Sequence, residues 1–114
     1  MEPVTFDDFL RVDIRVGRIV RVEDFPKARK PARKLWIDFG PALGERKTSA
    51  QVAHDAPEAL LGRLVVAVVN FPPRQVADFL SEVLLLGVPS AEGAAGQVVL
   101  LQPDRDVPLG GRMY

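Results

Sequence analysis

The Arg and Lys residues of segment 11–47 are the side chains of this sequence best suited to bind a ligand. The segment holds 11 Arg and Lys against 5 Asp and Glu, a local charge of +6, whereas residues 1–10 and 48–114 each carry −3. The net charge of the chain is therefore zero although its middle is strongly basic. Clustered Arg and Lys side chains attract polyanions such as nucleic acids. A solvated charged surface without a partner is the alternative that the pattern leaves open.

Groups suited to catalysis are sparse. His54 is the only histidine and no Cys is present, so the ligands of a histidine- or thiolate-based zinc site are missing. Ser49 and Ser81 could nominally join His54 and a carboxylate in a triad, but neither lies in a Gly-x-Ser-x-Gly sequence. Glycine-rich phosphate-binding motifs are also absent. We therefore expect a protein that is not an enzyme and that holds no metal and no cofactor.

The composition is that of one small globular domain. The chain has 114 residues, of which 47% are hydrophobic, and we expect a single domain over residues 1–114. The acidic N-terminus lacks the basic and apolar regions of a signal peptide. No apolar run approaches the ~20 residues that span a bilayer. These features predict a soluble, cytoplasmic protein that is not inserted in a membrane.

The elements that must position the basic residues are mostly strands. Period-2 alternation predicts a long first strand over 12–22. Gly17 at its break predicts a bulge or a sharp bend, which lets this strand serve two parts of a closed barrel. A turn with four bases follows over 24–33, and a flexible hairpin tip is predicted at 91–96. The later strands are predicted at 35–39, 47–52, 63–70, 83–86 and 97–101.

Two short helices complete the pattern. Thr5 is positioned to cap a helix that carries Phe6, Phe9 and Leu10 on one side. Residues 55–62 begin with a capping acid and a Pro in the first turn and end at a Gly, which predicts a second helix. Segment 75–86 allows either an apolar helix or a strand near its end, and we favour the strand.

This order of elements predicts the fold. About five strands with a helix between the third and the fourth are the layout of the OB-fold. We therefore predict an all-β protein, namely a five-stranded OB-fold Greek-key barrel with a short N-terminal helix and a short helix between strands 3 and 4.

Six segments of the sequence resemble the CsaA family. They are DIRVG at 13–17, KLWIDFG at 34–40, TSAQ at 48–51, VVNFPPRQ at 68–75, SEVL at 81–84 and VPLGG at 107–111. That family belongs to the tRNA-binding domains related to the cytokine-like EMAP domain and to the C-terminal appendage of bacterial methionyl-tRNA synthetase. The resemblance covers essentially the whole chain. Thr48 and Val52 depart from it, since the family usually shows Ser and Ile there.

The resemblance implies an OB-fold homodimer that binds tRNA and has a chaperone-like role in protein export. Phosphate contacts from Arg and Lys carry little sequence preference, so we expect a non-catalytic protein that recognises tRNA by structure rather than by sequence. The bases lie where an OB-fold binds oligonucleotides. The predicted contacts with tRNA are Arg15, Lys34, Lys47 and Arg74, with Ser49, Gln51, Asn70 and Ser81 as further polar partners. Local pairing of Asp13 with Arg15, or of Ser81 with Glu82, is the alternative role for these polar residues.

The aromatic residues favour a protein interface over base stacking. Trp36 alternates with Leu35 and Ile37, so it can lie on the outer face of its strand. Stacking on a base and packing at a dimer contact are both open to it. We predict a dimer interface formed by Phe6, Phe9, Leu10 and Trp36.

Two other functions remain open. The chain could mainly be a chaperone that binds unfolded polypeptides, preproteins or export machinery, with tRNA binding vestigial. Its binding surface would then lie around Phe71–Pro73 and residues 76–80. It could also be a module that docks on a larger translation assembly.

Overall fold

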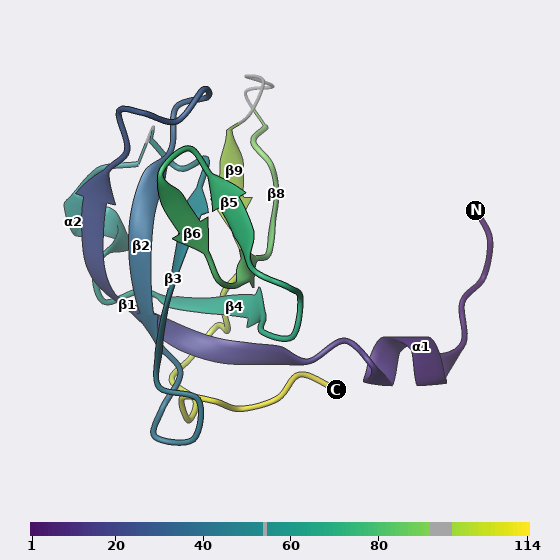
Figure 1. Ribbon diagram of the computed structural model, residues 1–114. Coiled ribbons are helices and arrows are strands. Elements are labelled where there is room, and N and C mark those ends of the chain that lie inside the picture. The colour runs from purple at the N-terminus through teal and green to yellow at the C-terminus, as the bar shows by residue number, and fades with distance from the viewer. Residues whose placement is uncertain (54, 92–96) are drawn as a thin grey trace.

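The chain forms a five-stranded antiparallel sheet that curls into a nearly closed barrel, consistent with an OB-fold (Figure 1). The computed structural model describes residues 1–53, 55–91 and 97–114. The sheet order is β3-β2-β1-β4-β7. Its strands are β1 (Ile14–Asp24), β2 (Arg33–Asp38), β3 (Glu45–Ala50), β4 (Leu64–Val68) and β7 (Leu84–Leu85). The core within this barrel comprises Ile19, Leu35, Ile37, Phe39, Val52, Leu60, Val65, Ala67, Val83, Leu85 and Leu100.

Strand β1 serves two parts of the barrel, as the sequence predicted. Its first half pairs with β4, from Ile14 opposite Val68 to Arg18 opposite Leu64. Its second half pairs with β2 as far as Asp24 opposite Arg33. The barrel closes where β3 meets the segment before β7, because the Glu82 N–H donates to the Lys47 carbonyl at 2.8 Å.

The predicted bulge at Gly17 is wrong, because the pairing of β1 with β4 continues through Gly17 without a shift. Strand β1 runs through Gly17, and its register shifts instead between Ile19 and Arg21. A Cβ at Gly17 would lie 2.4 Å from Ile37 Cγ2 and 2.9 Å from the Phe39 ring. The tight packing of the barrel interior therefore requires a glycine at this position.

The predicted strands at 35–39 and 47–52 both begin two residues too late in the chain, and they end one and two residues too late, respectively. The paired strands run from Arg33 opposite Ala50 to Asp38 opposite Glu45. Arg33 and Lys34 thus belong to β2, where the sequence placed them in or next to the preceding turn. Tertiary pairing of β2 with both β1 and β3 overrides the turn signal of Pro31.

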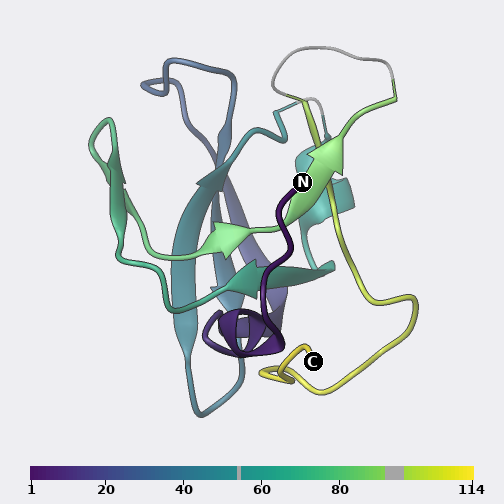
Figure 2. The ribbon, with the colours of Figure 1, turned by 90° about the vertical axis from the view of Figure 1, so that its right-hand side faces the viewer.

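Segment 74–81 is a hairpin that the sequence pattern did not predict. Strand β5 (Arg74–Val76) pairs with β6 (Phe79–Ser81), and Ala77 at the turn has a φ of 52°. A positive φ at the first turn residue is usually taken by glycine, so the turn signal was not visible in the sequence. A further pair of strands follows, in which β8 (Gly87–Pro89) pairs with β9 (Val98–Leu100). Strand β9 lies within the strand predicted at 97–101. In Figure 2 the green 74–81 hairpin lies at the left and the lighter green strand β8 at the right, so the two pairs of strands are separated in space.

Both predicted helices are present. Helix α1 (Phe6–Leu10) begins with Thr5 and Asp8 in a reciprocal capping box, and it projects away from the barrel (Figure 1). Helix α2 (Pro57–Leu60) is shorter than the predicted 55–62. Its N-cap residue is Ala56 without a side-chain cap, so the expected acidic cap is wrong, whereas Gly62 follows its end with a φ of 84°. His54 and most of the predicted hairpin tip at 91–96 lie outside the described residues.

Candidate nucleic-acid interface

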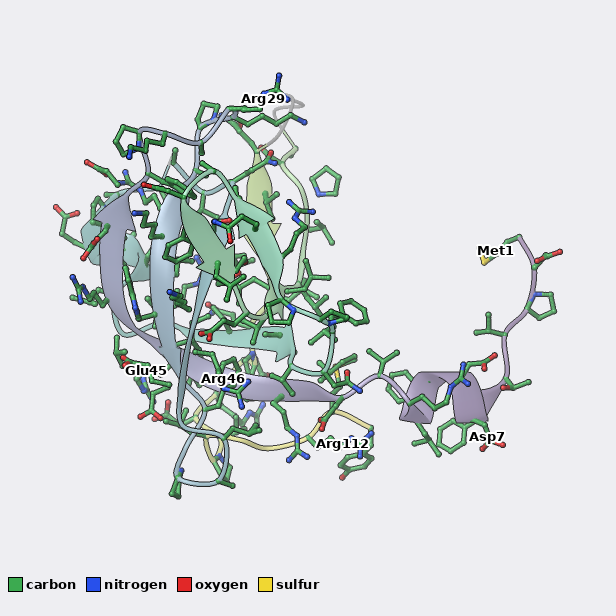
Figure 3. All side chains as sticks on the ribbon, in the orientation of Figure 1. Met1, Asp7, Arg29, Glu45, Arg46 and Arg112 are labelled. Atoms are coloured by element: carbon green, nitrogen blue, oxygen red, sulfur yellow. The ribbon has the colours of Figure 1, made fainter. Side chains whose placement is uncertain are left out.

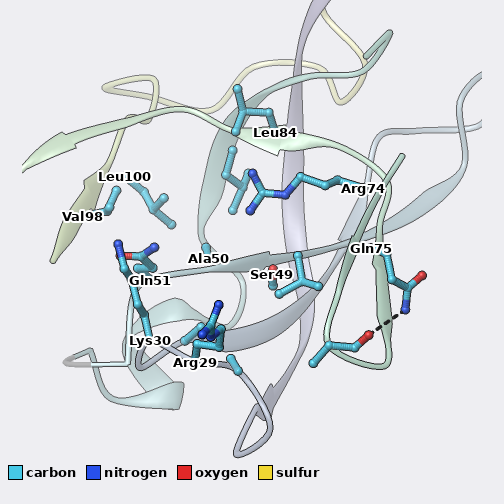
Figure 4. Close-up of a pocket in the computed structure, with 15 residues that line it drawn as sticks. Arg29, Lys30, Ser49, Ala50, Gln51, Arg74, Gln75, Leu84, Val98 and Leu100 are labelled. Atoms are coloured by element: carbon cyan, nitrogen blue, oxygen red, sulfur yellow. Dashed lines mark hydrogen bonds between the residues drawn. The ribbon is translucent and has the colours of Figure 1, made fainter. Parts of the chain in front are cut away.

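A groove of about 620 Å³ opens between the β1–β2 loop, the end of β3, the β5–β6 hairpin and strands β7 and β9 (Figure 4). We call it the basic groove. Its described lining comprises Ala28, Arg29, Lys30, Ala32, Ser49, Ala50, Gln51, Arg74, Gln75, Val76, Ala77, Leu84, Leu85, Val98 and Leu100. The groove therefore joins segments that are far apart in the sequence.

Three cations give the basic groove its charge. Arg29 and Lys30 come from the β1–β2 loop, and Arg74 reaches inward from the start of β5 (Figure 4). All three are exposed, and none of them forms an ion pair with the part of the chain that the structure describes. Among the same described residues, no Asp or Glu lines the groove. Unneutralised cations in a concave site focus a positive potential and attract anions.

The basic segment 11–47 does not form one patch. Figure 3 shows Arg29 at one end of the molecule and Arg46 near the other, close to Glu45. Arg21 pairs with Glu23, and Arg33 pairs with Asp24. Only part of the basic segment therefore faces the groove.

Ser49 and Gln51 lie in the groove beside these cations. The Ser81 hydroxyl, by contrast, is hydrogen-bonded to residues of β3. The Ser81 hydroxyl lies 2.8 Å from Thr48 Oγ1 and accepts from the Ser49 N–H at 3.3 Å. Glu82 does not pair with Ser81, because its carboxylate accepts from the Lys47 N–H at 2.9 Å. Neither the Ser49 hydroxyl nor the Gln51 amide forms a side-chain hydrogen bond with the described residues.

Lys34 and Lys47 lie next to the groove on an aromatic cluster. The Lys34 Nζ is 5.0 Å from the Phe25 ring centre and 5.1 Å from that of Phe79, while Lys47 Nζ is 5.2 Å from Phe79. Trp36 meets Phe79 edge-on with ring centres 5.9 Å apart. These cation–π contacts hold the two ammonium groups against the aromatic rings next to the β5–β6 hairpin.

An ion pair ties the two walls of the groove together. Lys27 Nζ in the β1–β2 loop lies 2.8 Å from Asp78 Oδ2 at the hairpin turn. This hydrogen bond raises the pKa of Lys27 and lowers the pKa of Asp78. Because both side chains are well exposed, the pair adds little stability.

Phe79 is the apolar anchor of the hairpin, and Phe79→Leu tests that role. Its ring is 6% exposed and packs on Phe25 and Trp36. We expect the substitution to lower the free energy of unfolding by about 1–2 kcal/mol, because aromatic pair contacts are lost without a large cavity. Chemical denaturation measures this loss. Phe71→Leu is the control, because Phe71 is 46% exposed and its change should be within experimental error. Equal effects of the two substitutions would contradict the anchor.

Arg15 and Asn70, both predicted to contact tRNA, are engaged within the chain. Arg15 Nε lies 2.6 Å from Asp13 Oδ1, and its Nη1 donates to the Gly110 carbonyl at 3.0 Å. Asn70 Oδ1 accepts from the Asp13 N–H, and its Nδ2 donates to the Arg11 carbonyl. The local pairing of Asp13 with Arg15 considered above is thus present. These contacts fix the start of β1 rather than line the basic groove.

The Asp13–Arg15 pair makes stability depend on pH. The hydrogen bond from Arg15 holds the pKa of Asp13 below its ordinary value of 3.8. Stability from this pair is therefore present above about pH 4 and is lost as the pH falls through the folded-state pKa. We expect Asp13→Asn to be less stable than the parent at pH 7 and to lose less stability between pH 5 and pH 2. Denaturation midpoints across that range measure the difference, and parallel profiles would contradict it.

Three of the four residues predicted for a dimer interface lie on α1. The Phe6 side chain is 69% exposed and Leu10 is 43% exposed, and Phe6 stacks on Phe9 with ring centres 6.2 Å apart. Trp36 lies on the outer face of β2, as predicted, because Leu35 and Ile37 are fully buried. Its ring is covered by the Arg21 guanidinium, 4.5 Å from the ring centre, and by Phe79.

Arg29, Lys30 and Leu84 line the groove but were not singled out from the sequence. Arg29 and Lys30 were counted only as part of the basic segment, and no signal linked them to Arg74. Within residues 1–53, 55–91 and 97–114, no group of three potential metal ligands occurs. In the same residues, no helix is long and apolar enough to cross a membrane.

Residues 14–112 match the family described as "Putative tRNA binding domain". The structure superposes on chaperone CsaA of Bacillus anthracis with a TM-score of 0.89 and 49% identity, covering 99% of this chain and 100% of that one. The CsaA chaperone of Picrophilus torridus also has a TM-score of 0.89, with 45% identity over 98% of this chain and 100% of that one.

A relative of a different kind matches over part of its length. The methionine–tRNA ligase of Porphyromonas gingivalis is 40% identical over 113 residues, which are 98% of this chain but only 16% of the ligase. The chain thus spans a small fraction of the ligases that it resembles.

Proposed function

This chain belongs to the tRNA-binding domain family, as a CsaA-type member, and we propose that it binds folded tRNA without catalysing a reaction on it. The observation that carries the proposal is the basic groove, where Arg29, Lys30 and Arg74 converge without a lining carboxylate among the described residues. The groove occupies the part of an OB-fold that binds oligonucleotides, next to the loop between the first two strands. Three separate cations on one concave surface suit a backbone of regularly spaced phosphates.

The residues divide into two roles in this proposal. Arg29, Lys30 and Arg74 contact phosphates in the groove, and Lys34 and Lys47 extend the positive surface beside it. Ser49 and Gln51 add hydrogen bonds. Arg15, Asn70 and Ser81 act indirectly, because their side chains hold the barrel that carries the contacts. Phosphate contacts carry little sequence information, so discrimination among RNAs comes from their shape.

The test is fluorescence-detected binding of folded tRNA at several salt concentrations, with duplex DNA and an unfolded polypeptide as competitors. We expect binding that weakens steeply as salt rises, because phosphate contacts release counterions. Only weak competition by the duplex DNA is expected. Absence of tRNA binding at low salt would overturn the proposal.

We further propose that the protein acts as a homodimer, with α1 at the contact. The exposed Phe6 and Leu10 project from the barrel and lack a covering surface within the described chain. Burial of such side chains against a second copy removes apolar area from water. Trp36 is left out of this contact because its ring already packs on Phe79 under Arg21. Light scattering should report a dimer that dissociates in Phe6→Asp/Leu10→Asp; a monomeric parent protein would contradict the contact.

An export chaperone that holds unfolded polypeptides is the second candidate. A smaller cavity of about 250 Å³ adjoins the basic groove and is lined in part by Phe71, Pro72 and Leu84. Phe71 and Leu84 are 46% and 48% exposed, and exposed apolar surface of this kind commonly marks an interaction site. Capture of the unfolded polypeptide together with absence of tRNA binding would place this function first.

A further inference from the structure

The floor of the basic groove is apolar, which phosphate binding does not require. Leu84 is 48% exposed at this floor, and the side chains of Leu85, Leu100, Val98 and Ala50 surround it. Figure 4 shows Arg74 extending over this floor from the hairpin, with Gln51 on the other side. An exposed leucine beneath a cationic rim fits a ligand that is apolar on one face and anionic at its edge.

The charge and the volume of the basic groove limit the kinds of ligand that it can bind. Three cations line the described part of the groove and no carboxylate does, so the ligand carries negative charge. The volume of about 620 Å³ lies within the range of roughly 300–1,000 Å³ that pockets for small molecules usually have. An extended polypeptide could place an apolar side chain on Leu84, but it has no regular negative charge for the rim. A nucleotide supplies both groups in one unit.

We propose that the basic groove receives one unpaired nucleotide of an RNA. Its base lies on the floor formed by Leu84, and its flanking phosphates lie at Arg29, Lys30 and Arg74. The Gln51 amide and the Ser49 hydroxyl, which have no side-chain partner in the described chain, face the polar edge of the base. The inference rests on the proposed binding of tRNA and names the part of the RNA that enters the groove.

A paired nucleotide does not fit this arrangement. In a duplex, both faces of a base are stacked and its pairing edge is already hydrogen-bonded. Neither the apolar floor nor the Gln51 amide could then reach it. An unpaired base has one free face and a free edge, so it can use both.

Competition by small RNAs tests the proposal directly. The probe is labelled folded tRNA, and the competitors are a blunt RNA duplex, the same duplex with an unpaired 3′ overhang, and a stem–loop with an equal number of phosphates. We expect the overhang, the stem–loop or both to compete at least tenfold better than the blunt duplex. The better of the two shows whether an end or a loop supplies the nucleotide. Equal competition by the blunt duplex would overturn the inference while leaving tRNA binding intact.

Two substitutions test whether the preference for unpaired nucleotides depends on the basic groove. Leu84→Glu places a carboxylate on the floor and should weaken binding of the better unpaired competitor by roughly tenfold or more. Val99→Glu is the matched control, because Val99 is 45% exposed on β9 between two groove residues and is itself absent from the groove lining. Gln51→Ala should cost roughly fivefold and leaves the charge unchanged.

The outcomes separate the inference from the proposed function. Loss of the preference in Leu84→Glu and Gln51→Ala, with Val99→Glu unchanged, supports the nucleotide site. An unchanged preference in both groove variants, with melting temperatures near that of the parent, overturns it. Failure of the parent protein to bind tRNA in the same assay counts against the proposed function instead.

Discussion

Gly17→Val should lower the free energy of unfolding by about 3 kcal/mol or more, the largest stability effect that we expect from a single substitution in this chain. The Cβ alone would lie 2.4 Å from Ile37 Cγ2 and 2.9 Å from two atoms of the Phe39 ring. Both neighbours are core residues with at most 1% exposure, so neither can move aside into solvent. Chemical denaturation followed by tryptophan fluorescence measures the loss, since Trp36 lies on the neighbouring strand.

Val20→Thr is the matched control for this prediction. Val20 lies in the same strand and is 43% exposed, and threonine keeps its β-branched shape. Its effect should remain within about 0.5 kcal/mol. If Gly17→Val were as stable as Val20→Thr, the barrel interior would be more adaptable than the close packing around Gly17 indicates.

Replacement of Arg29, Lys30 and Arg74 together by Ala should reduce tRNA affinity by roughly 100-fold at low salt. The three side chains are exposed and free of ion pairs in the described chain, so their removal leaves no buried charge unpaired and should not unfold the protein. If each cation contacts one phosphate, the slope of log affinity against log salt should also fall by about 2–3. Binding titrations at four or five salt concentrations measure both quantities.

A second triple variant controls for the change in net charge. Arg21, Arg46 and Arg105 are absent from the lining of the groove, and their replacement by Ala removes the same number of charges. We expect this variant to lose severalfold in affinity through the general field alone, with a salt slope close to that of the parent. Equal losses in the two variants would show that net charge, and not the groove, governs binding.

The role of each basic residue follows from where its side chain is held. Arg15 is bonded to Asp13 and to the Gly110 carbonyl, so it stabilises the first strand. Lys34 and Lys47 lie over the Phe79 ring, which keeps their charges at the surface. Arg29, Lys30 and Arg74 have no such partner in the described chain, and in the proposed function they contact the phosphates. Thus the charge count of the sequence overstates the number of cations available for binding.

Local pattern was enough to predict the OB-fold barrel, its buried fourth strand, the Thr5 cap of α1 and the Gly that follows α2. Each depends on residues close together in the chain, such as the alternation of apolar side chains in 12–22 or the reciprocal bonds of Thr5 and Asp8. The motifs shared with the CsaA family could likewise be recognised in the sequence without a structure.

The tertiary structure alone decided which of those residues meet. Arg74 joins Arg29 and Lys30 only because the 74–81 hairpin packs Phe79 against Phe25 and Trp36. That hairpin turns at Ala77 with a positive φ, which no local signal in the sequence marks. Gly17 likewise seemed to mark a bulge or bend of β1, and only the structure shows how close Ile37 in β2 and Phe39 just after β2 lie to it. Strand periodicity determines the face on which a side chain lies, but its partners there depend on register and packing between distant segments.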